Sequence, residues 1–250
     1  MRNLIYIFII ALICESSYAA ESHIKNKKIL WPFEGIFGSV DRQAAQRGFQ
    51  VYKEVCSSCH GISRISYRNL LEIGFSEAEI KEISKTYNVK DGPNDQGEMF
   101  ERQAIMSDKL VPPYANEQQA RAANNGAYPP DLSLIIKARH DGANYIYSLL
   151  TGYREPPEGF KMMEGLYYND YFPGHQIAMP RPLSDGQVEY QNGLPASVHQ
   201  MSSDLVVFLQ WAAEPEMERR KSLGLKTMIY LGLFTVIFYF AMKRIWSKLK

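Results

Sequence analysis

Apolar residues recur along much of the chain every three or four positions with charged residues between them, a pattern that predicts amphipathic helices. The first clear example follows Asp41, which can cap it, and runs to about Val55. One face of this predicted helix carries small or apolar residues, namely Ala45, Gly48, Phe49, Tyr52 and Val55. The helix leads directly into the residues that carry the clearest chemistry of the chain.

A second helix has a strong start signal. Ser76 and Glu79 form a capping box, and Phe75 stands where it can pack on Ile80. The helix is expected to end near Tyr87 and to have a structural purpose.

Weaker signals complete the part of the chain before residue 219. Further helices are predicted over residues 117–123, 132–139 and 143–150, and a last one is capped by Ser202 or Ser203 and ends before Pro215. Turn-forming residues predict loops over residues 90–97 and 151–199, with a small hairpin at 188–194. A long irregular segment such as 151–199 is usually functional in a compact domain.

The longest apolar run lies near the C-terminus. Residues 223–242 are mostly apolar and would make roughly 30 Å of helix, enough to cross a bilayer once. The alternative is a buried helix of a soluble protein. Basic residues flank both sides equally, so their distribution does not orient the helix. We expect a membrane anchor over residues 219–243 and a short tail over residues 244–250.

The first twenty residues or so have the pattern of a secretory signal peptide. Arg2 precedes an apolar run at residues 4–13, and Ser17 and Ala19 form a small-x-small cleavage site. A retained signal anchor is the alternative, and a lipoprotein signal is disfavoured because bulky Ile13 precedes Cys14. With residues 1–20 removed, residues 21–218 would form a domain outside the cytoplasmic membrane, and the tail would lie in the cytoplasm.

Composition bears on two questions: whether a nucleic acid is a partner, and whether the chain can form a structural disulfide. The 28 Lys and Arg nearly balance the 27 Asp and Glu, so charge gives no reason to expect a nucleic-acid partner. The chain has three cysteines: Cys14 in the predicted signal peptide, and Cys56 and Cys59 in one motif. No thiol is therefore left for a structural disulfide in the mature chain.

That motif, CSSCH at residues 56–60, is the attachment pattern of c-type haem. Two thiols a few residues apart on one turn can form thioethers with the two vinyl groups of haem, and His60 can ligate the iron. Half a zinc site or a thioredoxin-like pair would be the alternatives. Zinc would need two more Cys or His at finger spacing, and no strand-helix-strand pattern surrounds the motif. We therefore predict one covalently attached c-type haem.

A second iron ligand decides what the haem does, because methionine closes the site and favours electron transfer. Met179 is the best placed, since Pro180 prevents a helix and stiffens the loop around it. The residues leave other ligands open: Met99, Met106, Met162, Met163, Met201, Met217, His175 and His199.

Several blocks beyond the haem motif resemble the cytochrome c1 family, the membrane-anchored haem subunits of respiratory cytochrome bc1 complexes. They cover nearly the whole mature chain, at residues 121–133 (RAANNGAYPPDLS), 137–140 (KARH), 149–153 (LLTGY), 171–174 (YFPG), 177–180 (IAMP) and 211–216 (WAAEPE). The short chain with its signal peptide is most similar to bacterial, alphaproteobacterial members.

The resemblance implies a role for each matching residue. Cys56 and Cys59 would be the thioether sites, with His60 and Met179 as axial ligands. Arg139 would meet a haem propionate, which a guanidinium fork suits chemically. The remaining pocket residues implied by the family are Asn124, Pro129 and Tyr145. An acidic docking surface is also typical of the family, and its candidates here are Asp91, Asp95, Glu98, Glu101 and Asp108.

By the same resemblance, the fold is mainly α, a c-type-cytochrome-like haem domain with long loops and one C-terminal transmembrane helix. The protein would sit in the inner membrane with its haem domain in the periplasm, beside cytochrome b. It would take electrons from the Rieske iron-sulfur protein and pass them to cytochrome c, with no catalytic site of its own. The alternatives are a free-standing tethered electron carrier and a haem enzyme or gas sensor.

Overall fold

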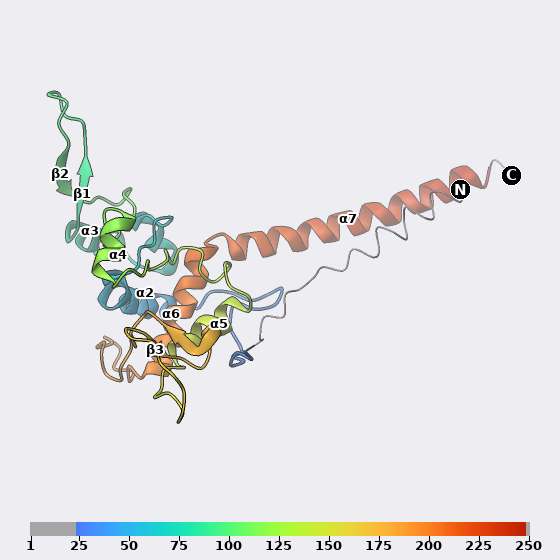
Figure 1. Ribbon diagram of the computed structural model, residues 1–250. Coiled ribbons are helices and arrows are strands. Elements are labelled where there is room, and N and C mark those ends of the chain that lie inside the picture. The colour runs from blue at the N-terminus through green and yellow to red at the C-terminus, as the bar shows by residue number, and fades with distance from the viewer. Residues whose placement is uncertain (1–23, 249–250) are drawn as a thin grey trace, which may run out of the picture.

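The computed structural model describes residues 24–248, so the predicted signal peptide lies outside the described part. Within that part the protein is mainly helical, as the sequence predicts (Figure 1). The α-helices are α2 (Arg42–Glu54), α3 (Glu77–Lys85), α4 (Glu117–Ala123), α5 (Gly142–Leu150), α6 (Val198–Ala213) and α7 (Met217–Trp246). Short 3₁₀ helices occur at η1 (Cys56–Ser58), η2 (Tyr67–Ile73) and η3 (Pro173–His175).

Helices α2 and α6 pack closely and form the centre of the core. A side chain at Gly48 of α2 would bring its Cβ within 2.1 Å of the carbonyl oxygen of Asp204 on α6, so this crossing requires glycine. Next to it, the Arg47 guanidinium donates two hydrogen bonds, of 2.9 and 2.7 Å, to the buried Asp204 carboxylate. This bidentate pair fixes how the two helices are rotated against each other.

Aromatic rings fill the space beside this crossing. The Phe208 ring of α6 lies 5.6 Å from Phe49 and 5.7 Å from Tyr52, both on α2, and 5.7 Å from Trp211. Phe49 also meets Phe75 edge-on at 5.5 Å, just before α3. The apolar face predicted for α2 therefore packs into the core, and this packing sets where the helix ends and the haem motif begins.

The strands are short. Strands β1 (Asn88–Asp91) and β2 (Phe100–Gln103) form an antiparallel hairpin that projects from the body, and β3 (Tyr167–Tyr168) pairs with β4 (Gln176–Ile177) (Figure 1). The second pair interrupts the long segment 151–199, which is otherwise irregular except for η3 and the first residues of α6. The sequence predicted the loop inside the first hairpin and did not predict its strands.

The structure confirms the starts of two helices that capping residues in the sequence predict. Asp41 accepts a hydrogen bond from the Ala44 amide at the start of α2, and Ser76 and Glu79 form the predicted capping box of α3. Helix α3 ends at Lys85, two residues before the expected end near Tyr87, because the chain turns there into β1. The predicted helices at residues 117–123 and 143–150 correspond to α4 and α5.

Three local predictions were wrong. Residues 132–139 form consecutive turns and not an α-helix, since the Ile135 and Lys137 amides bond the carbonyls three residues before them, at 3.2 and 3.0 Å, where an α-helix needs bonds four residues back. Residues 188–194 contain a turn without paired strands. Helix α6 starts one turn earlier than expected, since Ser197 caps it and Ser202 lies inside it, fully buried.

Helix α7 leaves the body as a single long rod (Figure 1). Its most apolar stretch of 18 residues has a mean hydropathy of 1.7, and none of that stretch is buried inside the protein. A helix of 30 residues whose apolar stretch is fully exposed fits a membrane span and not a core helix. It contains the predicted apolar run and extends it at both ends.

Candidate functional site

The haem motif occupies one tight turn at the end of α2. The Cys59 and His60 amides both donate to the Cys56 carbonyl, at 3.1 and 2.9 Å, so the backbone closes on itself between the two cysteines. Both thiols are free of disulfides. The chain thus presents two thiols and an imidazole from a single turn that is continuous with a core helix.

The His60 ring has one nitrogen fixed by the protein. Its Nδ1 lies 2.7 Å from the Pro130 carbonyl oxygen. A carbonyl only accepts hydrogen bonds, so Nδ1 carries the proton and Nε2 keeps a free lone pair. Burial lowers the pKa of His60, against the opposing effects of the Pro130 hydrogen bond and the Asp131 carboxylate. The ring is therefore neutral near pH 7 and suited to bind a metal ion.

A set of hydrogen bonds joins the segment after the motif to residues 130–133. The Asp131 carboxylate accepts from the Ser63 and Ser133 amides, each at 2.8 Å. The Arg64 amide donates to the Ser133 hydroxyl at 3.1 Å, and the Leu132 amide donates to the Gly61 carbonyl at 2.8 Å. The Pro130 carbonyl is therefore held in position by its neighbours, and with it the ring of His60.

The two cysteines differ in their surroundings. Cys56 packs against the hydrophobic core, and burial, with a smaller contribution from Cys59, raises the pKa of its thiol to about 12. The Ser58 hydroxyl lies 3.7 Å from the sulfur of Cys59. With its thiol protonated at neutral pH, Cys56 is not set up as a redox nucleophile.

Met179 follows β4 in the irregular segment and is half-buried. The Tyr153 hydroxyl donates to the Met179 carbonyl at 3.0 Å, across 26 residues of sequence. Burial, together with neighbouring Tyr145, raises the pKa of Tyr153, so its hydroxyl stays protonated and available as a donor. One side chain thus ties the backbone of the proposed ligand loop to the end of α5.

The pocket residues inferred from the resemblance lie close to this tie. Arg139 contacts Tyr145, and burial raises the pKa of Tyr145 while the Arg139 charge opposes that shift. Tyr145 also lies close enough to Tyr153 to help raise its pKa, and the Tyr153 hydroxyl holds the Met179 carbonyl. The structure therefore brings Arg139, Tyr145 and Met179 into one connected group. The Arg139 side chain is exposed, and its guanidinium donates to the Ala138 carbonyl at 3.2 Å and bonds Tyr145. A guanidinium has five N–H donors, so further donors are available for an anionic group.

Asn124 and Pro129 lie at the two ends of the short turn that follows α4. The Asn124 amide donates to the Ala120 carbonyl at 2.7 Å and to the Tyr114 hydroxyl at 3.0 Å, which closes the end of α4. Pro129 precedes the carbonyl that holds His60 and is half-buried. Pro129 therefore lies next to the residue that holds His60, and the role of Asn124 stays a prediction.

Four of the six rival methionines lie either in the core or at the surface, whereas Met106 and Met162 are half-buried like Met179 and stay open as alternatives. Met201 and Met217 are 0% and 3% exposed and belong to the hydrophobic core. Met99 and Met163 are 63% and 64% exposed. A filled core position and a free surface position both suit an iron ligand less well than the half-buried, tethered loop of Met179.

The two rival histidines each have one ring nitrogen engaged. The His175 Nδ1 lies 3.2 Å from the Asn169 carbonyl oxygen, and its ring stacks on Tyr168. The His199 Nδ1 lies 2.9 Å from the Tyr147 hydroxyl. These contacts explain both histidines as structural residues, although each retains a second nitrogen.

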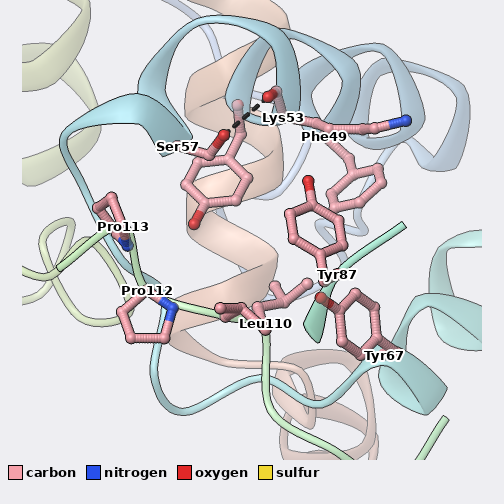
Figure 2. Close-up of a pocket in the computed structure, with 10 residues that line it drawn as sticks. Phe49, Lys53, Ser57, Tyr67, Tyr87, Leu110, Pro112 and Pro113 are labelled. Carbon is pink, nitrogen blue, oxygen red and sulfur yellow. Dashed lines mark hydrogen bonds between the residues drawn. The ribbon is translucent and has the colours of Figure 1, made fainter. Parts of the chain in front are cut away.

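Figure 2 shows a hollow beside the last turns of α2, where the Ser57 hydroxyl donates to the Lys53 carbonyl at 2.7 Å. None of Cys56, Cys59, His60 and Met179 lines it, so we do not assign the haem to this hollow. Its lining consists of Phe49, Tyr52, Lys53, Ser57, Tyr67, Tyr87, Leu110, Val111, Pro112 and Pro113.

The residues present fit a c-type haem better than a metal ion alone. Across residues 24–248, no three His, Cys, Asp or Glu gather into a metal site, which removes the zinc alternative for the described part. The turn instead offers two unpaired thiols beside one neutral imidazole whose Nε2 is free. That donor set matches two thioethers and one axial iron ligand.

The acidic docking surface stays a prediction, and the structure weakens two of its members. Arg102 pairs with Asp91 at 2.5 Å and with Asp108 at 2.6 Å, so both carboxylates are neutralised locally. Asp95, Glu98 and Glu101 are exposed on and near the β1–β2 hairpin.

The sequence reasoning missed three residues that position the site. The Pro130 carbonyl, the Asp131 carboxylate and the Tyr153 hydroxyl hold His60 and Met179 without being ligands. Pro129, Pro130 and Asp131 stand directly before the predicted helix at residues 132–139 and are typical of a helix start. The partners of Pro130 and Asp131 lie 70 and 68 residues away in the sequence, so local patterns do not reveal these contacts.

Comparisons with known proteins agree with the resemblance seen in the sequence. The model of the Cytochrome C1 family matches residues 31–249. The chain is 52% identical over 237 residues to "Cytochrome c1 1, heme protein, mitochondrial" of Arabidopsis thaliana, covering 94% of this chain and 76% of that protein. It is 45% identical to "Cytochrome c1" of Rhodospirillum rubrum over 265 aligned positions, covering 100% of this chain and 97% of that protein.

A fungal relative connects the family to a larger assembly. The chain is 44% identical over 241 residues to "Cytochrome b-c1 complex catalytic subunit, mitochondrial" of Candida albicans, covering 96% of this chain and 84% of that protein. Similarity at this level extends over the haem motif, the long irregular segment and the C-terminal helix alike. Together these matches show that the chain belongs to the cytochrome C1 family.

Proposed function

We propose that this protein is the electron-transfer subunit of a respiratory cytochrome bc1 complex and carries one covalently bound c-type haem. Cys56 and Cys59 would form the thioethers, and His60 and Met179 would be the axial ligands. The protein would accept electrons from the Rieske iron-sulfur protein and deliver them to cytochrome c. Quinol chemistry would take place in the cytochrome b partner.

The observation that carries the proposal is the fixed tautomer of His60. Its Nδ1 is held by the Pro130 carbonyl at 2.7 Å, directly after two free thiols on the same turn. A histidine held in this way has its Nε2 directed away from the backbone bond and ready for iron. A redox dithiol would have no use for such an imidazole.

The other residues supply orientation and electrostatics. A bound haem would supply one-electron redox chemistry, and the protein would make and break no substrate bond. Tyr153 holds the backbone at Met179, and Arg139 offers guanidinium donors for a carboxylate such as a propionate. Asn124, Pro129 and Tyr145 would line the site.

Membership of the cytochrome C1 family supports haem electron transfer and a place in a bc1 complex. Helix α7 supports a single-pass membrane anchor. We further propose that the haem domain lies on the periplasmic side of the inner membrane, because the first twenty residues have the pattern of a cleaved signal peptide. In this arrangement residues 21–218 form the periplasmic domain, residues 219–243 the anchor and residues 244–250 the cytoplasmic tail.

The junction between domain and anchor disfavours a free-standing tethered carrier. Such a carrier would need a long flexible linker, whereas only three residues separate α6 from α7. Glu214, in that junction, pairs with Lys137 at 3.1 Å and with Arg220 on α7. These contacts suit a domain with one fixed orientation inside a complex better than one that swings to reach its partners.

Affinity purification of the tagged protein from its membranes in mild detergent tests the proposal. We expect b-type haem and an iron-sulfur protein to co-elute, with inhibitor-sensitive quinol:cytochrome c activity in the eluate. A lone c-type spectrum that persists in gentler detergents would support the tethered carrier instead. Carbon monoxide binding by the reduced protein at neutral pH would point to a haem enzyme or sensor.

A further inference from the structure

The segment before α2 forms a loop with a buried base and an exposed tip. Trp31 and Phe33 at the base are 5% and 6% exposed, whereas Ile36 and Phe37 at the tip are 66% and 85% exposed. Two adjacent large apolar side chains open to water are costly unless another surface covers them. The function proposed above gives them no role.

The loop is held in shape by its base, so the exposure of its tip is built in. The Trp31 and Phe33 rings stack at 5.5 Å, and the Trp31 indole donates to the Asn144 side chain of α5 at 3.0 Å. The backbone turns so tightly that a Cβ at Gly38 would lie 2.0 Å from the Glu34 carbonyl oxygen. A packed base and a tight turn present Ile36 and Phe37 outward on a rigid support.

The same loop is bonded to the first turns of α7. The Lys221 ammonium donates to the Phe33 carbonyl at 2.6 Å and to the Gly38 carbonyl at 3.1 Å. The Glu218 carboxylate accepts from the Val40 amide at 2.9 Å. Both ends of the loop are therefore attached to α7 where it leaves the domain.

This attachment fixes the depth of the tip. Lys221 lies two residues before the apolar run that begins at residue 223, a rise of about 3 Å along the helix. Ile36 and Phe37 are at most three residues from a bonded carbonyl, so they lie within about 10 Å of it. Figure 1 shows the blue loop before α2 reaching out on the side from which α7 departs. The tip is therefore at the level where α7 enters the membrane.

We propose that Ile36 and Phe37 insert into the interfacial layer of the bilayer beside α7. The occupant is lipid because the tip is apolar and continuous with the lipid-facing surface of α7. The haem domain would then rest on the membrane at two points, which restricts its tilt relative to the anchor. This inference rests on α7 being the membrane anchor.

Spin labels can test this inference in the purified complex reconstituted into nanodiscs. Phe37→Cys carries the label at the tip, and Phe100→Cys, on the projecting β1–β2 hairpin, is the matched aqueous control. Phe238→Cys labels the middle of α7, and the labelled parent complex gives the background from other thiols. Collision of each label with oxygen, which concentrates in lipid, and with a water-soluble nickel chelate is measured by power saturation. An unchanged haem spectrum confirms that each variant is folded.

We expect the oxygen-to-nickel collision ratio at position 37 to be several-fold above that at position 100 and closer to that at position 238. A ratio equal to that at position 100 would place the tip in water and overturn the proposal. Low collision with both reagents would mean that another subunit covers the tip, which also overturns it. A water-accessible label at position 238 would show that α7 is not an anchor, and the failure would then belong to the proposed function.

Discussion

The two sides of the proposed haem site are held with different firmness. On the His60 side, the ring is bonded to Pro130, and three further hydrogen bonds join residues 61–64 to residues 131–133. On the Met179 side, the Tyr153 hydroxyl supplies a single long-range bond to the Met179 carbonyl. The first ligand is therefore part of a network, and the second stands in a loop with one such tie.

This difference has a physical consequence. Each hydrogen bond contributes about 0.5–1.5 kcal/mol net, so the His60 side has several times the local stabilisation of the Met179 side. Local opening follows the weakest contacts. We therefore expect Met179 to leave the iron before His60 does, and changes near Met179 to alter the redox potential more than the fold.

The largest effect is expected from removing the covalent link that both sides share. The double variant Cys56→Ala, Cys59→Ala has no thiol to form a thioether, so haem should be lost almost completely under denaturing conditions. Haem staining of a denaturing gel measures this. The matched variant Ser57→Ala, Ser58→Ala changes only the intervening residues and should keep the stain. Staining of the cysteine-free variant at the parental level would refute covalent attachment at this motif.

The next effect comes from the weaker side. Met179→Leu should leave haem attached and lower the midpoint potential by roughly 0.1–0.3 V, a fraction of the about 0.8 V that axial ligands span. Redox titration of the purified complex gives the value. Met163→Leu, at an exposed position in the same segment, is the control and should match the parent. If both variants kept the parental potential, Met179 would be the wrong residue.

On the firmer side, Asp131→Asn should weaken the contacts to Ser63 and Ser133 and destabilise the protein by about 1 kcal/mol, since the site is partly exposed. Burial raises the pKa of Asp131, but the hydrogen bonds from Ser133 and Ser63 outweigh it and leave the pKa below its usual value. Because the pKa is lowered on folding, this contribution is present above about pH 4 and is lost as the pH falls through the lowered value.

Guanidinium unfolding of the full chain in detergent, followed by haem absorbance, measures the Asp131 effect. The gap between parent and Asp131→Asn should be full at pH 7 and shrink on acidification below pH 4. Asp95→Asn, at an exposed position on the hairpin loop, serves as the control for loss of one charge. A gap that is independent of pH would show that the carboxylate charge is not responsible.

The smallest effect is expected from Tyr153→Phe, which removes the tie to the Met179 carbonyl and keeps the ring. The loss of one hydrogen bond, about 0.5–1.5 kcal/mol, should raise the affinity of an external ligand such as imidazole for the oxidised iron by roughly 2–13-fold. Spectroscopic titration with imidazole measures it. Tyr167→Phe, at an exposed tyrosine of β3, should leave that affinity unchanged. An unchanged affinity in Tyr153→Phe would mean that the tie does not hold the ligand loop.

The parts of the fold that could be predicted have local causes. Asp41 and Ser76 start α2 and α3 with their own side chains, and the haem motif needs only one turn of chain. The apolar run of α7 is also a local property. Each of these features is decided within one continuous stretch of at most about twenty residues, so the sequence pattern indicates it directly.

The failures have long-range causes. Residues 132–139 have a helical pattern, but the Leu132 amide bonds the Gly61 carbonyl, far away in the sequence, and the segment folds into turns. At α6, both predicted caps lie within the helix, and Ser197 starts it instead, because burial of Ser202 is decided by the packing of the helix against α2. The roles of Pro130 and Tyr153 likewise depend on partners far away in the sequence. The resemblance identified the ligands, and the structure was needed to see what holds them.

Near-infrared magnetic circular dichroism of the oxidised complex tests the central claim most directly, because the charge-transfer band of low-spin haem distinguishes histidine–methionine from bis-histidine ligation. The account predicts a histidine–methionine band in the parent that disappears in Met179→Leu and persists in Met163→Leu. A bis-histidine band in the parent, or a histidine–methionine band that survives in Met179→Leu, would contradict it.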